Sequence, residues 1–324
     1  MRGGAEQATE MLVGALERAG HRADLVRLPT AWDATRIFDA ALAWRLVPMD
    51  ADLVIATNFP SYFVRHPNKV VWLFHQHRGA YDAVDSPWSD LGLDDASLET
   101  QRLLATWDTT ALEEARRVFA LSGVVADRLA RYNGLAAEPL YPPPPLHDQL
   151  SPGSPGDEVL TVTRLEQNKR PWLLVEAMAE VRSPLRAAVA GKGSAAGELV
   201  ATVDRLGLGD RVDLLGYVDD DELVRRFRSA LAVVYAPLDE DYGLVTLQAF
   251  LAGVPVITAA DSGGVLEWVE DGVTGLVTDG TPAGVAAAID RLAGDRRWAR
   301  ELGEAGRERA AALDWDAVVA RLTS

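Results

Sequence analysis

The sequence contains no cysteine, which excludes disulfide bonds and zinc–thiolate sites. It has no apolar run near the roughly 20 residues that span a bilayer, and residues 1–10 lack the apolar core of a signal peptide. We therefore expect a cytoplasmic protein with no integral membrane association. Positive charge is also scarce. The net charge of −16 disfavours binding to nucleic acid, so any phosphate site must be local.

Two further signatures are missing. No Gly-x-Gly-x-x-Gly turn follows a first strand, which argues against a dinucleotide-dependent oxidoreductase. His75 and His77 follow a predicted strand, but neither cysteine nor a third histidine stands nearby to complete a zinc site. The acidic runs at 239–241 and 219–222 are typical of helix starts, where acids cap the helix and complement its dipole. We therefore expect neither a metal site nor a cofactor.

What the sequence does contain is an alternation of short apolar runs and helical periodicity. With 324 residues and 48% hydrophobic content, the chain can bury the cores of two domains. The pattern predicts an α/β fold with parallel sheets. Helices are expected over 4–20 and 123–134. Strands are expected over 22–28, 52–58, 69–75 and 117–122 in the first half, and over 158–165, 186–191, 212–218, 231–237, 255–261 and 274–278 in the second.

The segment between these two halves is rich in proline and glycine. Residues 141–158 read YPPPPLHDQLSPGSPGDE, and neither residue type continues a strand or a helix easily. We interpret the segment as a linker. It predicts an N-terminal domain over residues 1–150 and a C-terminal domain over residues 151–324.

Polar residues at strand ends are the candidates for binding, because open α/β sheets bind ligands beyond the carboxyl ends of their strands. Arg164 follows one strand of the second domain, and Lys169 stands five residues later. An arginine fork and a mobile lysine charge together suit a diphosphate. The alternative is that both are solvated surface charges, and the sequence pattern alone leaves that alternative open.

A second strand-to-helix connection has the same layout. The stretch LDEDYGLVTLQAFLAGVPVI, residues 238–257, places Gly243 before a helix whose unpaired N–H groups could hold an anion. Glu240 would lie at the mouth of that site, or it could be an ordinary capping acid. In the first domain His75 ends a strand, and it is either a hydrogen-bonding residue of the site or a histidine satisfied by the loop backbone.

An ordered set of motifs then resembles a known family. VTRLEQNKRPWLLVEAM, AGKGS, VDLLGYVDDDELVRRF, EDYGLVTLQAFLAGVPVI and SGGVLEWVEDGVTGLV follow one another through the second domain, and GGAEQATEMLVGALERAGHRADLV and SGVVADRLARYNG stand in the first. Together they resemble the GT-B glycosyltransferases of family 4. The resemblance implies two Rossmann-like, doubly wound domains facing a cleft. It also implies a retaining transferase that uses a nucleotide-sugar donor and needs no metal.

The resemblance also implies roles for residues that bind the donor phosphates. Arg164 and Lys169 match the diphosphate-binding pair. The turn and helix start formed by Tyr242, Gly243 and Leu244 match the donor-phosphate loop.

Other positions match the family's contacts to the sugar and the base. Glu240 matches the first acid of the E-x7-E motif, which contacts the transferred sugar, and His75 matches a strand-end histidine that reaches the same sugar. Gly3 and Gly4 match the N-domain loop facing the donor. Tyr217 and Val218 fall where the family holds the nucleobase.

Two departures from the family pattern stand out. The second acid of E-x7-E, which receives the ribose hydroxyls, is Gln248 here, so charge assistance is lost and weaker nucleotide binding is expected. The family's first strand, which precedes its Gly-Gly loop, is missing. We expect a retaining glycosyltransferase with an unknown acceptor. The alternative is a non-catalytic member that binds nucleotide or a partner glycosyltransferase, and the two departures motivate it.

Overall fold

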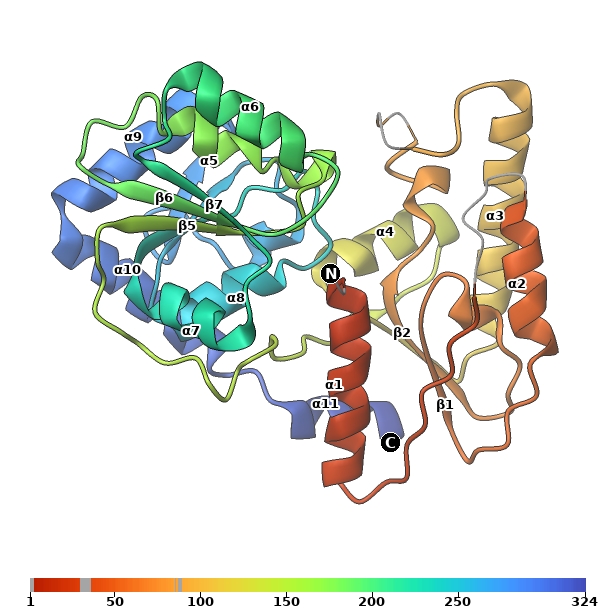
Figure 1. The fold of residues 1–324 in the computed structure, drawn as a ribbon. Helices are drawn as coiled ribbons and strands as arrows, with labels where there is room; N and C mark the ends of the chain where they lie inside the picture. Colours follow the sequence, from red (N-terminus) through yellow and green to blue (C-terminus); the bar gives the residue numbers. More distant parts are fainter. Residues whose placement is uncertain (1–2, 30–35, 85, 87–88) are drawn as a thin grey trace. The chain divides into compact units, whose positions relative to one another are not determined.

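The computed structural model describes residues 3–29, 36–84, 86 and 89–324. These residues form two compact units (Figure 1). One unit comprises Gly4–Pro142 together with Asp314–Ser324, and the other comprises Pro143–Leu313. The sequence suggested a boundary near residue 150 with the last helix in the second domain. In the structure the division lies at Pro143, and the final helix packs with the first unit.

The N-terminal unit is built on a parallel four-stranded sheet in the order β1-β2-β3-β4. The strands are β1 (Val54–Asn58), β2 (Lys69–His75), β3 (Arg117–Ala120) and β4 (Glu138–Pro139). The helices are α1 (Gly4–Arg18), α2 (Ile37–Leu46), α3 (Asp95–Glu113), α4 (Gly123–Asn133) and α11 (Trp315–Thr323). Strand β2 is central and almost wholly buried, as its continuous apolar run KVVWLFH requires.

Local sequence signals explain where these helices begin and end. Asp94 caps α3 by accepting hydrogen bonds from the backbone N–H groups of Ala96 and Ser97. Ser122 caps α4 in the same way, and Gly134 ends that helix in the left-handed conformation that glycine adopts without strain. The edge of the Trp72 ring packs against Trp315, which attaches α11 to the central strand.

One predicted strand of this unit is wrong. Residues 21–29 form neither strand nor helix, although the short apolar run within 22–28 predicts a strand. In the described part of the chain β1 is the edge of the sheet, so no strand lies beside this segment to complete its backbone hydrogen bonds. The segment leaves Leu25 and Val26 partly exposed, which shows that a short apolar run alone does not make a strand.

A buried carboxyl group lies inside the N-terminal unit. Asp108 on α3 is completely buried and accepts a hydrogen bond of 2.5 Å from the Tyr81 hydroxyl. Burial raises the pKa of Asp108 to about 7, although the hydrogen bond from the Tyr81 phenol partly opposes this effect. The carboxyl is therefore largely neutral in the folded protein below neutral pH, whereas in the unfolded chain it ionises near pH 4.

This difference predicts a pH-dependent stability. The folded state keeps the Asp108 proton while the unfolded chain loses it. The contribution to stability is therefore fully present below pH 4 and is lost as the pH rises to about 7. Asp108→Asn removes this dependence. We expect the variant to match wild type at pH 4 and to exceed its unfolding free energy by about 4 kcal/mol at pH 8, since a shift of about three pKa units is worth about 1.36 kcal/mol per unit.

Urea unfolding at both pH values measures the effect, with Asp127→Asn on the exposed side of α4 as the control. The difference between Asp108→Asn and wild type should grow with pH, whereas that of Asp127→Asn should stay constant. A constant difference for Asp108→Asn would show that this carboxyl is ionised in the folded protein.

The C-terminal unit is built on a parallel six-stranded sheet in the order β10-β9-β8-β5-β6-β7. The strands are β5 (Glu158–Val162), β6 (Arg186–Ala190), β7 (Val212–Gly216), β8 (Ala230–Val234), β9 (Val256–Ala259) and β10 (Gly275–Thr278). The helices are α5 (Trp172–Ala177), α6 (Ala196–Leu206), α7 (Asp220–Ser229), α8 (Leu244–Leu251), α9 (Pro282–Gly294) and α10 (Arg296–Ala310). Figure 1 shows α5 and α6 on one face of this sheet and α7 and α8 on the other. All six strands predicted for this half are present.

The strand order of this sheet has a reversal point. From β5 the chain proceeds outward through β6 and β7, and it then returns to place β8 on the other side of β5. Helices that follow these two strands lie on opposite faces, the arrangement in which open α/β sheets form a crevice outside the carboxyl ends of their strands. Open α/β sheets bind their ligands at such a point.

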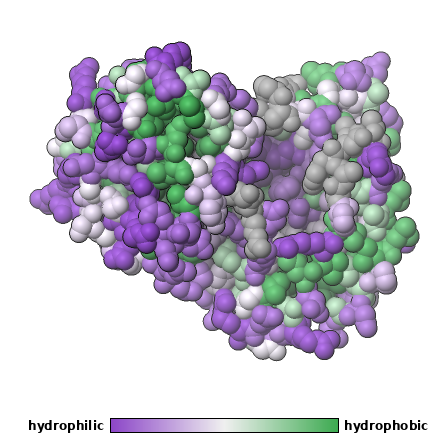
Figure 2. Space-filling view, viewed as in Figure 1, coloured by the Kyte–Doolittle hydropathy of each residue, from purple (hydrophilic) through white to green (hydrophobic). Residues whose placement is uncertain are grey.

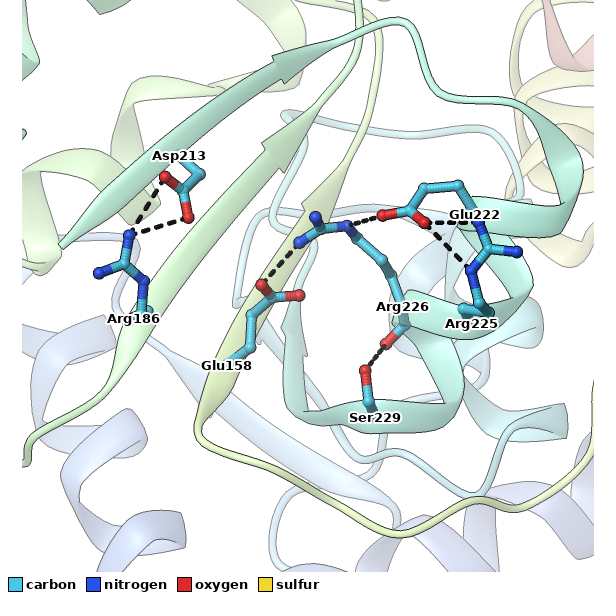
Figure 3. Close-up of polar contacts among 7 residues, drawn as sticks. All are labelled: Glu158, Arg186, Asp213, Glu222, Arg225, Arg226 and Ser229. Carbon is cyan, nitrogen blue, oxygen red and sulfur yellow. Dashed lines mark hydrogen bonds and ion pairs between the residues drawn. The ribbon is translucent and has the colours of Figure 1, made fainter. Parts of the chain in front are cut away.

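At the opposite ends of the strands, arginines are paired with acids (Figure 3). Arg226 on α7 bridges Glu158 at the start of β5 and Glu222, each at 2.7 Å. Arg186 at the start of β6 pairs with Asp213 at 3.1 Å. These cations are compensated within the unit, so this edge of the sheet is structural.

The surface of the chain is mainly hydrophilic on the face shown in Figure 2, with smaller apolar areas between. None of the helices in the described ranges combines the length and the apolar composition needed to cross a bilayer.

Candidate functional site

The candidate site lies at the reversal point of the second sheet. The loop after β5 carries Arg164 and Lys169, and the loop after β8 carries Tyr235 and Glu240. A backbone hydrogen bond of 2.8 Å from Leu238 to the carbonyl of Asn168 joins the two loops. The tertiary structure therefore brings the two cations and the acid together, although about 70 residues separate them along the chain.

Glu240 is the centre of this arrangement. Its Oε2 atom forms an ion pair with the Lys169 ammonium and accepts a hydrogen bond of 3.0 Å from the Tyr235 hydroxyl. The Lys169 and Glu240 side chains are only 12% and 16% exposed, so water screens their attraction weakly. The position of Glu240 is thus set by two partners on different elements, which is more than helix capping requires.

The Tyr235 hydroxyl stays protonated in this environment. Burial, and then the negative charge of Glu240, raise the pKa of Tyr235 well above its ordinary value, while Arg164 acts in the opposite direction. The phenol is therefore a hydrogen-bond donor to Glu240 at any physiological pH.

Arg164 differs from the other two charged groups. Its side chain is exposed, and within the described part of the chain its guanidinium forms no hydrogen bond or ion pair. An exposed arginine whose donors are not engaged, next to a buried ion pair, is available to an anion that enters the crevice.

Arg170 completes the site, and sequence reasoning missed it. Its guanidinium donates to the carbonyl oxygens of Ala236 at 2.7 Å and Pro237 at 3.1 Å, and it pairs with Asp261 at 2.6 Å. It thereby joins the loops that follow β5, β8 and β9. Its backbone has a left-handed φ of 45°. Such a conformation is strained for an arginine, so it persists because these contacts hold it. No sequence signal marks Arg170 beyond its place next to Lys169.

Two glycines fit closely against the backbone of the Glu240 loop. A Cβ at Gly263 would lie 2.6 Å from the Glu240 carbonyl oxygen, and a Cβ at Gly264 would lie 2.5 Å from that of Asp241. The Gly264 N–H donates to the Glu240 carbonyl at 2.7 Å. The turn at residues 262–264 therefore packs against the backbone of the Glu240 loop, and only glycine leaves room for this contact.

The turn that precedes α8 has the geometry expected of an anion site. Gly243 has a left-handed φ of 85°, and a Cβ there would lie 2.8 Å from a Val265 methyl carbon. Tyr242 is buried with its ring edge against Trp268, which anchors the turn, and Leu244 begins the helix half-buried. The Thr246 N–H at the start of α8 donates to the Gly243 carbonyl at 2.9 Å, so the N–H groups of Leu244 and Val245 are the ones that offer donors and a partial positive charge.

Gln248 has a contact that the sequence did not suggest. Its side chain is buried, and its amide nitrogen donates to the Pro145 carbonyl oxygen at 3.1 Å. A glutamate at this position could not donate to that carbonyl. The amide therefore holds the proline-rich segment against α8, while its oxygen keeps the capacity to accept a hydrogen bond.

The loops after β6 and β7 border the site on one side. A Cβ at Gly191 would lie 1.8 Å from the Thr163 carbonyl oxygen, so only glycine fits where the β6 loop crosses the β5 loop. The Lys192 ammonium lies 5.5 Å from the centre of the Tyr217 ring, and this ring is 59% exposed. Val218 follows it, half-buried. An exposed aromatic ring at a strand end offers a surface for stacking.

The remaining predicted residues belong to the N-terminal unit or to its start. His75 ends β2, is half-buried, and places its Nδ1 atom 3.0 Å from the Gln76 carbonyl oxygen. Gly4 opens α1, and Gly3 stands directly before it. The backbone contact of His75 agrees with the simpler interpretation of a loop-satisfied histidine.

The acidic run at 219–222 serves as a helix start, as expected, but the expectation is wrong for 239–241: Gly243 is the N-cap of α8, and the first turn of that helix contains no acid. Asp219 caps α7 by accepting a hydrogen bond of 2.8 Å from the Glu222 N–H. Among the described residues, no three histidine, aspartate or glutamate side chains come together in a way that could hold a metal ion.

Comparison with known proteins connects this geometry to a family. The family model of the group 1 glycosyl transferases matches residues 146–309, which cover nearly all of the C-terminal unit. A D-inositol 3-phosphate glycosyltransferase of Frankia alni is 38% identical over 175 residues, or 50% of this chain and 43% of that protein. The enzyme of the same name from Nocardia farcinica is 31% identical over 72% of this chain and 54% of that protein. The chain thus spans about half the length of the curated relatives that it matches.

Solved structures agree on the fold. A sucrose-phosphate synthase from Thermosynechococcus elongatus superposes with a TM-score of 0.78 over 99% of this chain and 92% of that chain, at 22% identity. HepE from Anabaena, solved with UDP and glucose, superposes with a TM-score of 0.68 over 100% of this chain and 82% of that one, at 20% identity. The expected fold class, two α/β units of the GT-B type, is confirmed. The chain therefore belongs to the group 1 glycosyl transferases.

Proposed function

We propose that this protein transfers a sugar from a nucleoside diphosphate sugar to a hydroxyl-bearing acceptor with retention of anomeric configuration. The observation that carries the proposal is the cluster at the reversal point of the second sheet. There, Arg164, Lys169 and the start of α8 offer positive charge, and Glu240 is oriented beside them. A nucleotide-sugar donor needs cations for its diphosphate and a hydrogen-bond acceptor for its sugar. The cations and the acceptor both lie at the carboxyl ends of β5 and β8.

The phosphate part of the site would act on the leaving group. When the glycosidic bond of the donor breaks, negative charge grows on the departing nucleoside diphosphate. The free Arg164 guanidinium, the Lys169 ammonium and the α8 N–H groups would stabilise that charge. These groups supply the positive charge that a metal ion supplies in other transferases, so a metal-independent reaction is proposed.

Glu240 would bind the sugar. Because Lys169 and Tyr235 both engage Oε2, the carboxylate is oriented to accept hydrogen bonds from sugar hydroxyls through its other oxygen. We assign no protein nucleophile. In the retaining mechanism that we propose, the acceptor attacks from the side of the leaving group, and the departing diphosphate takes the acceptor proton.

The relatives suggest which molecules to test first. UDP and glucose are bound in the Anabaena structure, so UDP-glucose is the first donor to try. The curated relatives are named for D-inositol 3-phosphate, which makes that molecule the first acceptor. Tyr217 and Val218 are proposed to hold the nucleobase, and His75, Gly3 and Gly4 to face the donor. A cytoplasmic location stays a prediction.

The experiment is a donor screen with purified protein. Nucleotide sugars are screened by thermal shift, and each stabilising donor is then assayed for sugar release with and without acceptor. NMR of the product reports the anomeric configuration. Sugar transfer with retention in the presence of EDTA supports the proposal. Binding without turnover for every donor and acceptor would favour the alternative of a non-catalytic member, and an inverted product would contradict retention.

A further inference from the structure

Tyr235 is a buried residue to which neither the family motifs nor the proposed donor contacts assign a part. It follows β8 directly, is 6% exposed, and donates its hydroxyl hydrogen to Glu240 at 3.0 Å. The bond comes from the base of the loop, so it does not depend on anything entering the crevice. Glu240 therefore has one partner, Tyr235, at the end of β8 and another, Lys169, in the loop after β5.

The partner in the loop after β5, Lys169, has a second task. If the proposed function holds, Lys169 binds the donor diphosphate, and an ammonium shared with two phosphates attracts Glu240 less strongly than it does without donor. A glutamate side chain released from its cation regains rotamer freedom at the moment when its orientation matters. The Tyr235 hydroxyl would still hold Oε2, because its own position is set by burial.

We propose that Tyr235 is a positioning residue for the donor sugar, which keeps the Glu240 carboxylate oriented while Lys169 turns to the diphosphate. This inference rests on the proposed function and names a residue that the function itself does not require. It separates the site into two parts: Arg164 and Lys169 act on the phosphates, and the Tyr235–Glu240 pair acts on the sugar.

The test compares the binding of UDP with that of UDP-glucose by calorimetry in wild type and Tyr235→Phe. Phenylalanine keeps the ring and removes only the hydroxyl, so the fold and the phosphate contacts should persist. We expect the affinity for UDP to stay within about twofold, because UDP lacks the sugar that Glu240 contacts. The affinity for UDP-glucose should fall by about fivefold, because a carboxylate without this hydrogen bond must be ordered when the sugar binds.

Two controls make the comparison specific. Tyr132→Phe removes a phenol hydroxyl from the half-buried Tyr132 in the N-terminal unit and should leave both affinities unchanged. In a Glu240→Ala background, adding Tyr235→Phe should have no further effect, because the carboxylate that it positions is gone. Conversely, independent effects of the two changes would mean that Tyr235 does not act through Glu240.

Failure of this inference can be told apart from failure of the proposed function. If wild type binds UDP and UDP-glucose, and Tyr235→Phe binds each of them with wild-type affinity, only the role of Tyr235 is refuted. An equal loss of affinity for both ligands also refutes it, since a general distortion of the site would then explain the result. If wild type binds no nucleotide sugar in the screen, the proposed function falls and the inference falls with it.

Discussion

Alanine at Lys169 is expected to lower the turnover of the nucleotide sugar by about 100-fold or more, and alanine at Arg164 by a similar factor. Both side chains are placed to stabilise charge that appears on the leaving diphosphate as the bond breaks. Their loss should therefore reduce kcat and not merely weaken donor binding. The effect at Lys169 has a second component, because its removal also leaves the buried Glu240 carboxylate without its cation.

Steady-state kinetics with the donor identified by the screen measures this prediction, and circular dichroism checks that the fold survives. Arg225→Ala is the matched control, because Arg225 is an exposed arginine of the same unit that pairs with Glu222 on α7 (Figure 3). It should retain wild-type turnover. Unchanged turnover in both Arg164→Ala and Lys169→Ala would remove these residues from the diphosphate site.

Glu240→Gln is expected to lower sugar transfer by about 30-fold or more while leaving the affinity for the free nucleoside diphosphate within about threefold. Glutamine keeps the size of the side chain and an acceptor for the Tyr235 hydroxyl. It loses the charge that pairs with Lys169 and that strengthens hydrogen bonds to the sugar. The free nucleoside diphosphate has no transferable sugar, so its affinity should depend little on Glu240.

Transfer assays together with calorimetry of UDP binding give both quantities. Glu222→Gln on α7 changes a carboxylate at the paired arginines of Figure 3 and serves as the control for a general loss of charge. A loss of UDP affinity as large as the loss of transfer would mean that Glu240 contacts the nucleotide and that its assignment to the sugar is mistaken.

Much of this architecture could be predicted from local sequence. The apolar runs of the second half predicted all six strands of the C-terminal sheet, because a buried parallel strand is a short continuous apolar run in any α/β fold. The cap at Asp219 and the left-handed Gly243 follow from residue types that favour those positions. Arg164 and Lys169 were also recognisable as candidates, since Arg164 stands at the end of a predicted strand and Lys169 five residues later.

Other features could not be predicted in this way. The short apolar run within 22–28 predicts a strand, but a strand exists only where a neighbour completes its hydrogen bonds, and none lies beside this segment in the described chain. The amide of Gln248 could be assigned to the Pro145 carbonyl only once the proline-rich segment was seen to pack on α8. Nothing in the residues around Arg170 indicates that it joins three loops.

The sequence by itself determined the fold class, the strands of the second sheet and the residue types available at their ends, because these depend on periodicity and on neighbours a few positions away. Only the tertiary structure decided which of those ends meet. Strand β8 pairs with β5, and not with β7, which precedes it along the chain. This pairing sets the Lys169 ammonium and the Tyr235 hydroxyl on the same oxygen of Glu240. Its cause is physical. Strand order depends on how helices pack across both faces of the whole sheet, and that packing sums contacts that no single stretch of sequence contains.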